Sequence, residues 1–124
     1  MPKKISHEEL LRKIFSTAYC FKELGYYGSK KKAIKTLLKQ KEFAKYSSQT
    51  AVRQFEQAVK IITDTSDFIR AEIEAKTPLV SRTRAEVNLA MNNLRETLSR
   101  KNSQAPQEMI QYALNWVYMN YYLR

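Results

Sequence analysis

Residues 47–76 have the sequence SSQTAVRQFEQAVKIITDTSDFIRAEIEAK, in which apolar side chains return every three or four positions. The apolar positions of this repeat are Val52, Phe55, Val59, Ile62, Ile69 and Ile73. This spacing places side chains on one face of an α-helix, so the stretch predicts a long amphipathic helix. Ser47 or Ser48 suits its N-cap, and Thr77-Pro78 ends it because a residue before proline avoids the α region.

The repeat has a polar gap in its middle. The slot between Ile62 and Ile69 is filled by Thr65 or Ser66. The segment Thr63-Asp64-Thr65-Ser66-Asp67 is rich in residue types that cap helices, so it equally suits the end of one helix and the start of another. Two alternatives therefore stay open, which are one continuous helix and a helix that is broken near this segment.

Four further helices are predicted around the long one. The first covers residues 7–24, because the capping box Ser6-His7-Glu8-Glu9 precedes an apolar repeat and Gly25 favours the left-handed conformation that ends a helix. The other three begin after the N-cap Ser29, after the N-cap Ser81 and at Pro106. Proline suits the first position of a helix, where its missing N–H would have no partner.

The composition favours an all-α protein. The chain has 124 residues, close to the commonest domain size, and 44% of them are hydrophobic, which is enough to form a core without metal or disulfide. Glycine (2) and proline (3) are scarce, which favours a few long helices over many turns. We therefore predict one all-α bundle of about five helices, with a basic helical pair at residues 1–46 and a three-helix core at residues 47–124.

The last predicted helix is apolar on nearly all of its faces. Its apolar and aromatic positions are Met109, Ile110, Tyr112, Ala113, Leu114, Trp116, Val117, Tyr118, Met119, Tyr121, Tyr122 and Leu123. Such a helix lies at the centre of a core or is covered by a second chain. We expect it at the centre of the bundle, and a protein partner or self-association through this helix is the alternative.

The positive charge is concentrated in the first half of the chain. The formal net charge is +10, and residues 1–60 hold 14 Lys and Arg against 5 Asp and Glu, a net charge of +9. Residues 61–124 hold 8 against 7, a net charge of +1. Clustered cations create a local field that attracts polyanions, so the asymmetry favours an anionic partner.

The segment from Tyr26 to Tyr46 combines lysines with tyrosines. Lysines neutralise phosphates, and aromatic rings stack with bases, so the mixture is typical of a sequence-tolerant binder of a nucleic-acid backbone. The predicted nucleic-acid-binding residues are Lys30, Lys31, Lys32, Lys35, Lys39, Lys41, Lys45, Arg53, Tyr26, Tyr27 and Tyr46. The alternative is a solvated lysine face that keeps a basic protein in solution, with the tyrosines half in the core.

A helix-turn-helix is a sharper form of the same hypothesis. The lysine-rich helix, a turn near residues 45–47 and the start of the long helix would form it. Gln49, Thr50, Arg53 and Gln54 are of types that contact base edges. The small residue expected in the turn is missing, and the connection is long for this motif.

The sequence indicates no catalytic residue, no metal site and no cofactor. His7 and Cys20 are the single histidine and the single cysteine, and on one helix they would lie about 20 Å apart. A Cys–His dyad needs hydrogen-bond contact, and a zinc site usually needs at least three protein ligands. No glycine-rich phosphate-binding motif is present. We therefore predict a protein that is not an enzyme.

The same sequence predicts a cytoplasmic protein with no membrane contact. The first residues lack the apolar core of a signal peptide, and no apolar run approaches the roughly 20 residues of a membrane span. A single cysteine forms no internal disulfide, so nothing indicates an oxidising compartment.

Taken together, these features predict a non-catalytic accessory or assembly subunit of a nucleoprotein complex, which contacts DNA or RNA phosphates through its N-terminal lysines. In size, charge and helical class the chain is similar to the small helical subunits of nucleoprotein machines, including those of CRISPR effector complexes, although no motif carries this likeness. The alternative is a protein–protein interaction module, such as an adaptor, inhibitor or immunity protein, that docks an acidic partner.

Overall fold

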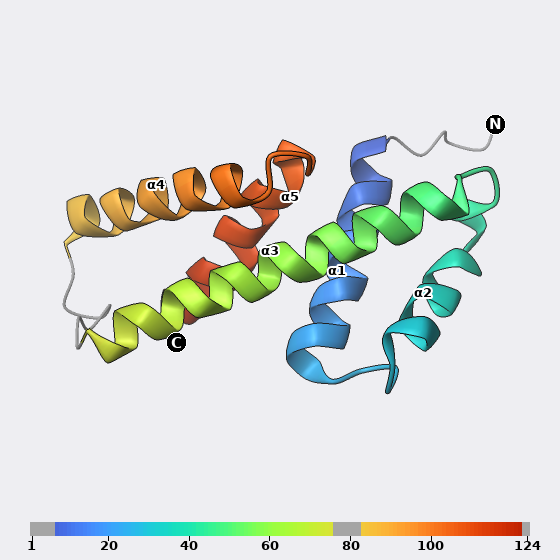
Figure 1. Cartoon of the computed structure of the whole chain (residues 1–124), viewed down its shortest axis with the longest axis horizontal. Helices are drawn as coiled ribbons and strands as arrows, with labels where there is room; N and C mark the ends of the chain where they lie inside the picture. The colour runs from blue at the N-terminus through green and yellow to red at the C-terminus, as the bar shows by residue number, and fades with distance from the viewer. Residues whose placement is uncertain (1–6, 76–82, 123–124) are drawn as a thin grey trace. The chain divides into compact units, whose positions relative to one another are not determined.

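A computed structural model of the chain describes residues 7–75 and 83–122, with the side chains of 121 and 122 left out. It confirms the all-α helical bundle, and the described residues form no strand (Figure 1). The helices are α1 (His7–Leu24), α2 (Lys30–Leu38), α3 (Ser48–Glu74), α4 (Arg84–Lys101), α5 (Gln107–Tyr112) and α6 (Met119–Tyr122). A 3₁₀ turn at Lys41–Phe43 follows α2, and a π-helical segment at Ala113–Tyr118 joins α5 to α6.

The chain divides into two compact units, Met1–Lys60 and Ile61–Arg124. Unit 1 holds α1, α2 and the first half of α3, and unit 2 holds the second half of α3 with the helices that follow. All of the residues predicted to bind nucleic acid belong to unit 1. The boundary between the units, after Lys60, falls inside α3, which runs from Ser48 to Glu74 without a break.

Unit 1 is built around the apolar stripe of α1. Leu11, Ile14 and Phe15 are fully buried on this helix, and α2 packs against it through Ala33 and Leu37. The bounds of α1 are those predicted, and Gly25 has a φ of 70°, the left-handed conformation that glycine adopts without steric penalty. The predicted N-cap of α2 is confirmed, since the Ser29 hydroxyl accepts a hydrogen bond from the Lys32 N–H at 3.2 Å.

The long helix α3 is continuous across its polar gap. The hydroxyl of Thr65, which is fully buried, donates a hydrogen bond of 2.7 Å to the Ile61 carbonyl one turn earlier. The buried hydroxyl thus has a hydrogen-bond partner within the helix, so the helix can continue without exposing this group to water. The alternative of a helix that is broken here is wrong. At the start of α3, Ser47 is the cap, because its hydroxyl accepts a hydrogen bond from the Thr50 N–H at 3.3 Å.

Unit 2 packs α4 against α5 and the π-helical segment. Leu94 and Leu98 of α4 are fully buried, as are Met109 and Leu114 of the last helical stretch. The expected N-cap Ser81, with Thr77-Pro78, lies outside the described residues. The structure begins α4 at Arg84 and caps it with Thr83, whose hydroxyl accepts a hydrogen bond from the Glu86 N–H and donates one to the Glu86 carboxylate at 3.0 Å.

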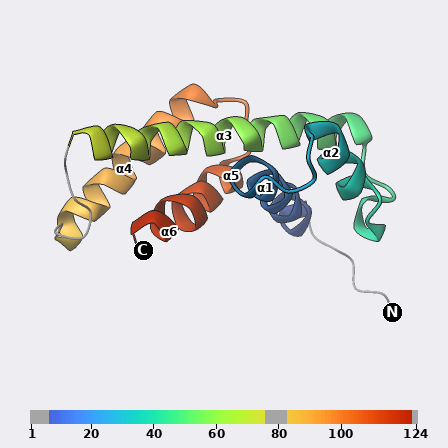
Figure 2. The same ribbon diagram turned by 90° about the horizontal axis from the view of Figure 1, so that it is seen from below.

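The last helical stretch, from Gln107 to Tyr122, is continuous through its π-helical segment (Figure 2). Its buried residues are Met109, Ile110, Ala113, Leu114, Val117 and Tyr118. Gln111, Asn115 and Asn120 are exposed, so this helix has a solvent edge. Gln111 and Asn115 lie four residues apart on one edge, so the helix that we expected at the centre of the bundle is not covered on all of its faces.

Candidate nucleic-acid interface

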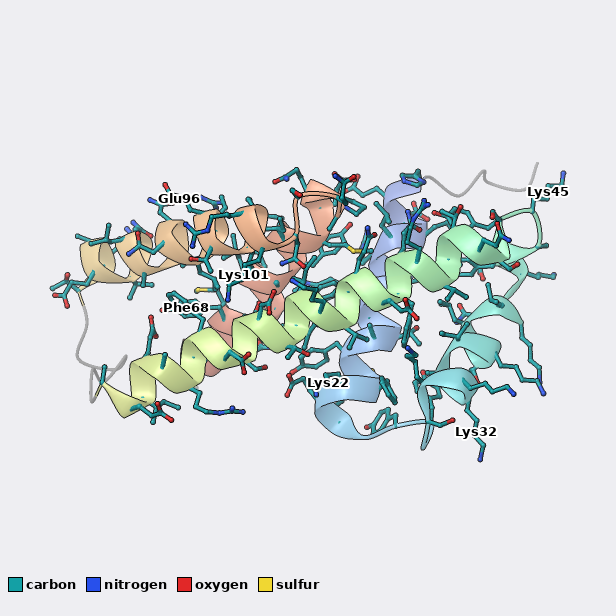
Figure 3. The ribbon with its side chains drawn as sticks, in the orientation of Figure 1. Lys22, Lys32, Lys45, Phe68, Glu96 and Lys101 are labelled. Carbon is teal, nitrogen blue, oxygen red and sulfur yellow. The ribbon has the colours of Figure 1, made fainter. Side chains whose placement is uncertain are left out.

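The lysines of α2 lie on two different sides of the helix. Each residue turns the side-chain direction by about 100°, so Lys31, Lys32, Lys35 and Lys39 lie on the side of α2 away from the buried pair Ala33 and Leu37, with Lys35 directly opposite it. All four lysines are exposed. Figure 3 shows Lys32 extending from the first turn of α2 into solvent. We call Lys31, Lys32, Lys35 and Lys39 the α2 lysine face.

Lys30 is excluded from this face by its own position on the helix. It lies on the side of α2 that faces the core, and its Nζ is 3.1 Å from Oε1 of Glu56 on α3. Both side chains are about half exposed, so the ion pair adds little stability. The pair nevertheless places a carboxylate beside Lys30, and this lysine therefore has less free charge to offer a polyanion.

The four lysines of the face have no such neighbour. Within residues 7–75 and 83–122, no carboxylate lies within ion-pair distance of any of them. The first turn of α2 also holds no acidic residue. Lysines there oppose the positive end of the helix dipole, typically by about 0.3–1 kcal/mol each. Unit 1 therefore maintains an electropositive surface at some expense to the local stability of α2.

The remaining predicted cations are placed elsewhere on unit 1. Lys41 lies on the 3₁₀ turn and Lys45 in the loop before α3, and both are exposed. Figure 3 shows Lys45 beyond the end of α2 that is farther from Lys32. Arg53 is exposed on α3, one turn before Glu56, where that carboxylate offsets part of its field. The structure thus gathers the α2 lysine face and leaves these three cations outside it.

The three predicted tyrosines differ in their surroundings. Tyr26 is 55% exposed, and its ring meets that of Tyr27 edge to face with centroids 6.5 Å apart. Both lie in the loop that leads into α2, beside the first lysines. Tyr46 packs against Phe43 and His7 at centroid distances of 5.7 and 6.3 Å. Because internal contacts occupy its ring, Tyr46 is a poor stacking surface for a base.

The hydroxyl of Tyr46 is also committed within the unit. It donates a hydrogen bond of 2.5 Å to Oε1 of Gln54, a residue that is buried. Gln54 was one of the candidate base-reading residues of a helix-turn-helix. This motif is not formed, because nine residues, 39–47, separate α2 from α3 and include a 3₁₀ turn.

The comparisons with known proteins identify no relative. The chain matches no family model, no curated protein and no solved structure. Its function is therefore argued from its own residues.

The acidic side chains that could serve acid–base chemistry have structural contacts in unit 2. Asp64 accepts a hydrogen bond from Asn102 at 3.1 Å, and both carboxylate oxygens of Glu72 lie 3.2 Å from the hydroxyl of Tyr118, which is buried. Asp67 lies 3.7 Å from Arg70, also on α3. Among the described residues, no three His, Cys, Asp or Glu side chains gather as metal ligands would.

Unit 2 also carries an apolar surface pocket of about 420 Å³. Its lining residues are Arg84, Val87, Asn88, Met91 and Met119. Leu89, next to Asn88 on α4, is 61% exposed. The lining holds no carboxylate and combines two methionines and a valine with the polar side chains of Arg84 and Asn88. No described helix combines the length and the apolar composition that a membrane crossing requires.

Sequence reasoning missed two residues of the chain that pair with predicted site residues. Glu56 pairs with Lys30 across 26 positions, and Gln54 binds Tyr46 across the turn before α3. Neither pair follows a local spacing rule, because each depends on how α2 and the loop fold back on α3. The available signal was the helical position of Lys30 on the apolar side of α2.

Proposed function

We propose that this protein binds the phosphate backbone of a nucleic acid through the α2 lysine face, without catalysing a reaction. The observation that supports this most is the grouping of four exposed lysines on one side of α2, with no described carboxylate within ion-pair distance. A solvated surface that served only solubility would have no need to segregate its cations from its carboxylates in this way.

The dimensions of the face set the size of its footprint. Lys32 and Lys39 are seven residues apart, which corresponds to about 10 Å along the helix axis. A nucleic-acid strand advances by about 3.4 Å per phosphate in B-form DNA, so the row of lysines spans about three phosphates. Each neutralised phosphate lowers the slope of log K against log salt by about 0.7 for single strands and 0.9 for B-DNA. Three contacts correspond to a slope of about −2 to −3.

The experiment compares two triple variants that carry the same net charge. K32E/K35E/K39E inverts three of the four lysines of the α2 lysine face, and R70E/R84E/R95E inverts three exposed arginines of unit 2. Each substitution changes the charge by −2, so both variants fall from +10 to +4. Fluorescence anisotropy with labelled oligonucleotides over a salt series measures the affinity and the slope of each protein.

We expect the α2 variant to lose measurable binding at moderate salt, and the arginine variant to keep most of its affinity. An equal loss in both variants would mean that only net charge matters and would overturn the proposal. Polyglutamate serves as the probe for the rival role, in which the face docks an acidic protein. Binding of polyglutamate without binding of any oligonucleotide would favour that rival.

The proposal assigns the protein to the cytoplasm, as an accessory or assembly subunit of a nucleoprotein complex. Its protein contact would come from the C-terminal helical stretch, where Met119 lines the apolar pocket beside α4. Apolar pockets with flexible methionines are suited to protein partners.

A further inference from the structure

The loop before α2 presents an aromatic ring to solvent at the same end as the first lysines. Tyr26 is 55% exposed, the most exposed of the Phe, Trp and Tyr residues whose side chains are described. Its backbone is fixed, because the Tyr26 N–H donates a hydrogen bond of 3.1 Å to the Cys20 carbonyl near the end of α1. Two residues after Tyr27, Ser29 caps α2. The backbone that carries the ring is thus fixed between the end of α1 and the start of α2.

Tyr27 supports this placement by an uncommon backbone conformation. Its φ is 73°, in the left-handed region that a bulky side chain rarely occupies, and Gly25 and Gly28 on either side have φ values of 70° and 76°. The resulting tight turn keeps Tyr27 half buried and places its ring edge to face with that of Tyr26. Tyr27 thus covers at most one face of the Tyr26 ring, and the opposite face is left for an external partner.

An exposed aromatic ring beside a row of lysines favours the binding of a single strand over the binding of a duplex. In a duplex each base is already stacked between its neighbours, so a surface tyrosine gains no base contact. In a single strand the unstacked bases are free to stack on an aromatic side chain. The row itself contains no arginine, asparagine or glutamine that would read base edges in a duplex groove.

We infer that the α2 lysine face takes a single-stranded nucleic acid, with one base stacked on Tyr26. This inference rests on the proposed function and adds the form of the ligand to it. The strand runs along α2, its phosphates contact Lys32, Lys35 and Lys39, and a base at the start of the row lies on the tyrosine ring. Recognition is tolerant of sequence, because every base has a face that stacks.

The test separates stacking from charge with three probes of equal length. These are a mixed-sequence single strand, the duplex that it forms with its complement, and an abasic strand with the same number of phosphates. Y26A removes the ring, and Y26F keeps it as the matched control. Because Tyr26 is exposed, we expect both variants to fold, and circular dichroism checks their helix content before binding is measured.

We expect the wild-type protein to bind the single strand more tightly than the duplex or the abasic strand at equal salt. Y26A weakens single-strand binding about 5- to 150-fold, the range that one base–aromatic stack supports, and leaves abasic binding unchanged. Y26F binds within about twofold of wild type, because a phenyl ring stacks as well as a phenol.

Three results overturn the inference and leave the proposed function standing, provided that K32E/K35E/K39E still abolishes binding. They are equal or tighter binding of the duplex, equal binding of the abasic strand, and no effect of Y26A on single-strand affinity. Absence of binding by all three probes at low salt instead overturns the proposed function itself.

Discussion

At the position of Lys32, a cation favours the proposed binding, whereas a carboxylate would favour the stability of the helix. It is the third residue of α2, and its N–H donates to the side chain of the N-cap Ser29. A glutamate at this position would face the positive end of the helix dipole and could reach back to the N-cap N–H, which completes a capping box. We therefore predict that K32E stabilises the protein although it damages the proposed interface.

The stabilisation expected from K32E is the sum of two electrostatic effects in the first turn of α2. Removal of the cation from the first turn and addition of a carboxylate there are each worth about 0.3–1 kcal/mol at low ionic strength. Their sum is about 1 kcal/mol after solvent screening of this exposed site is considered. For a chain of this size, a gain of 1 kcal/mol raises the melting temperature by about 3–6 °C. The salt slope of binding becomes shallower by about 0.7–0.9, because one phosphate contact is lost.

Lys35 provides the matched comparison on the same face. It belongs to the last turn of α2, where a cation is favourable and a carboxylate is not. K35E should therefore lower the melting temperature by a similar amount, while it weakens oligonucleotide binding as much as K32E does. Thermal denaturation by circular dichroism and anisotropy titrations of the same two samples give both readings. Melting temperatures that move in the same direction would refute the dipole argument, and unchanged affinity in either variant would refute the placement of the interface.

Three further predictions concern stability. Y118F should lower the free energy of unfolding by about 1.5–3 kcal/mol in urea denaturation, because it removes a buried hydroxyl from the Glu72 carboxylate. N102A should lower it by about 1–3 kcal/mol, since the amide of this residue donates to both Asp64 and the Leu98 carbonyl; a change below 0.5 kcal/mol would contradict that role. Y27N should leave the melting temperature unchanged or raise it, because asparagine tolerates the left-handed conformation better; a fall of several degrees would mean that ring packing outweighs backbone strain.

Much of the fold was predictable because local signals agree with it. The bounds of α1 follow from an apolar repeat that ends at Gly25, and the N-cap Ser29 fixes the start of α2. The continuity of α3 was not predictable, because a threonine in the middle of a helix is compatible with either a cap or a bond to the preceding turn. Only the buried position of Thr65 decides between them.

The candidate site was predictable in composition and less so in arrangement. Charge counting finds the lysines of α2, and the helical period separates Lys30 from the α2 lysine face. The internal role of Tyr46 could not be predicted, since it depends on contacts with His7 and Gln54 from two different helices. The left-handed conformation of Tyr27 likewise has no sequence signal beyond the glycines on either side.

Lysine footprinting locates the nucleic-acid interface residue by residue. An amine-reactive reagent is applied to the protein with and without a saturating oligonucleotide, and mass spectrometry measures the modification of each lysine. We predict protection concentrated at Lys32, Lys35 and Lys39, while Lys22 of α1 and Lys45 before α3 keep most of their reactivity (Figure 3). Equal protection of Lys22, or full reactivity of the three lysines in a saturated complex, would contradict it.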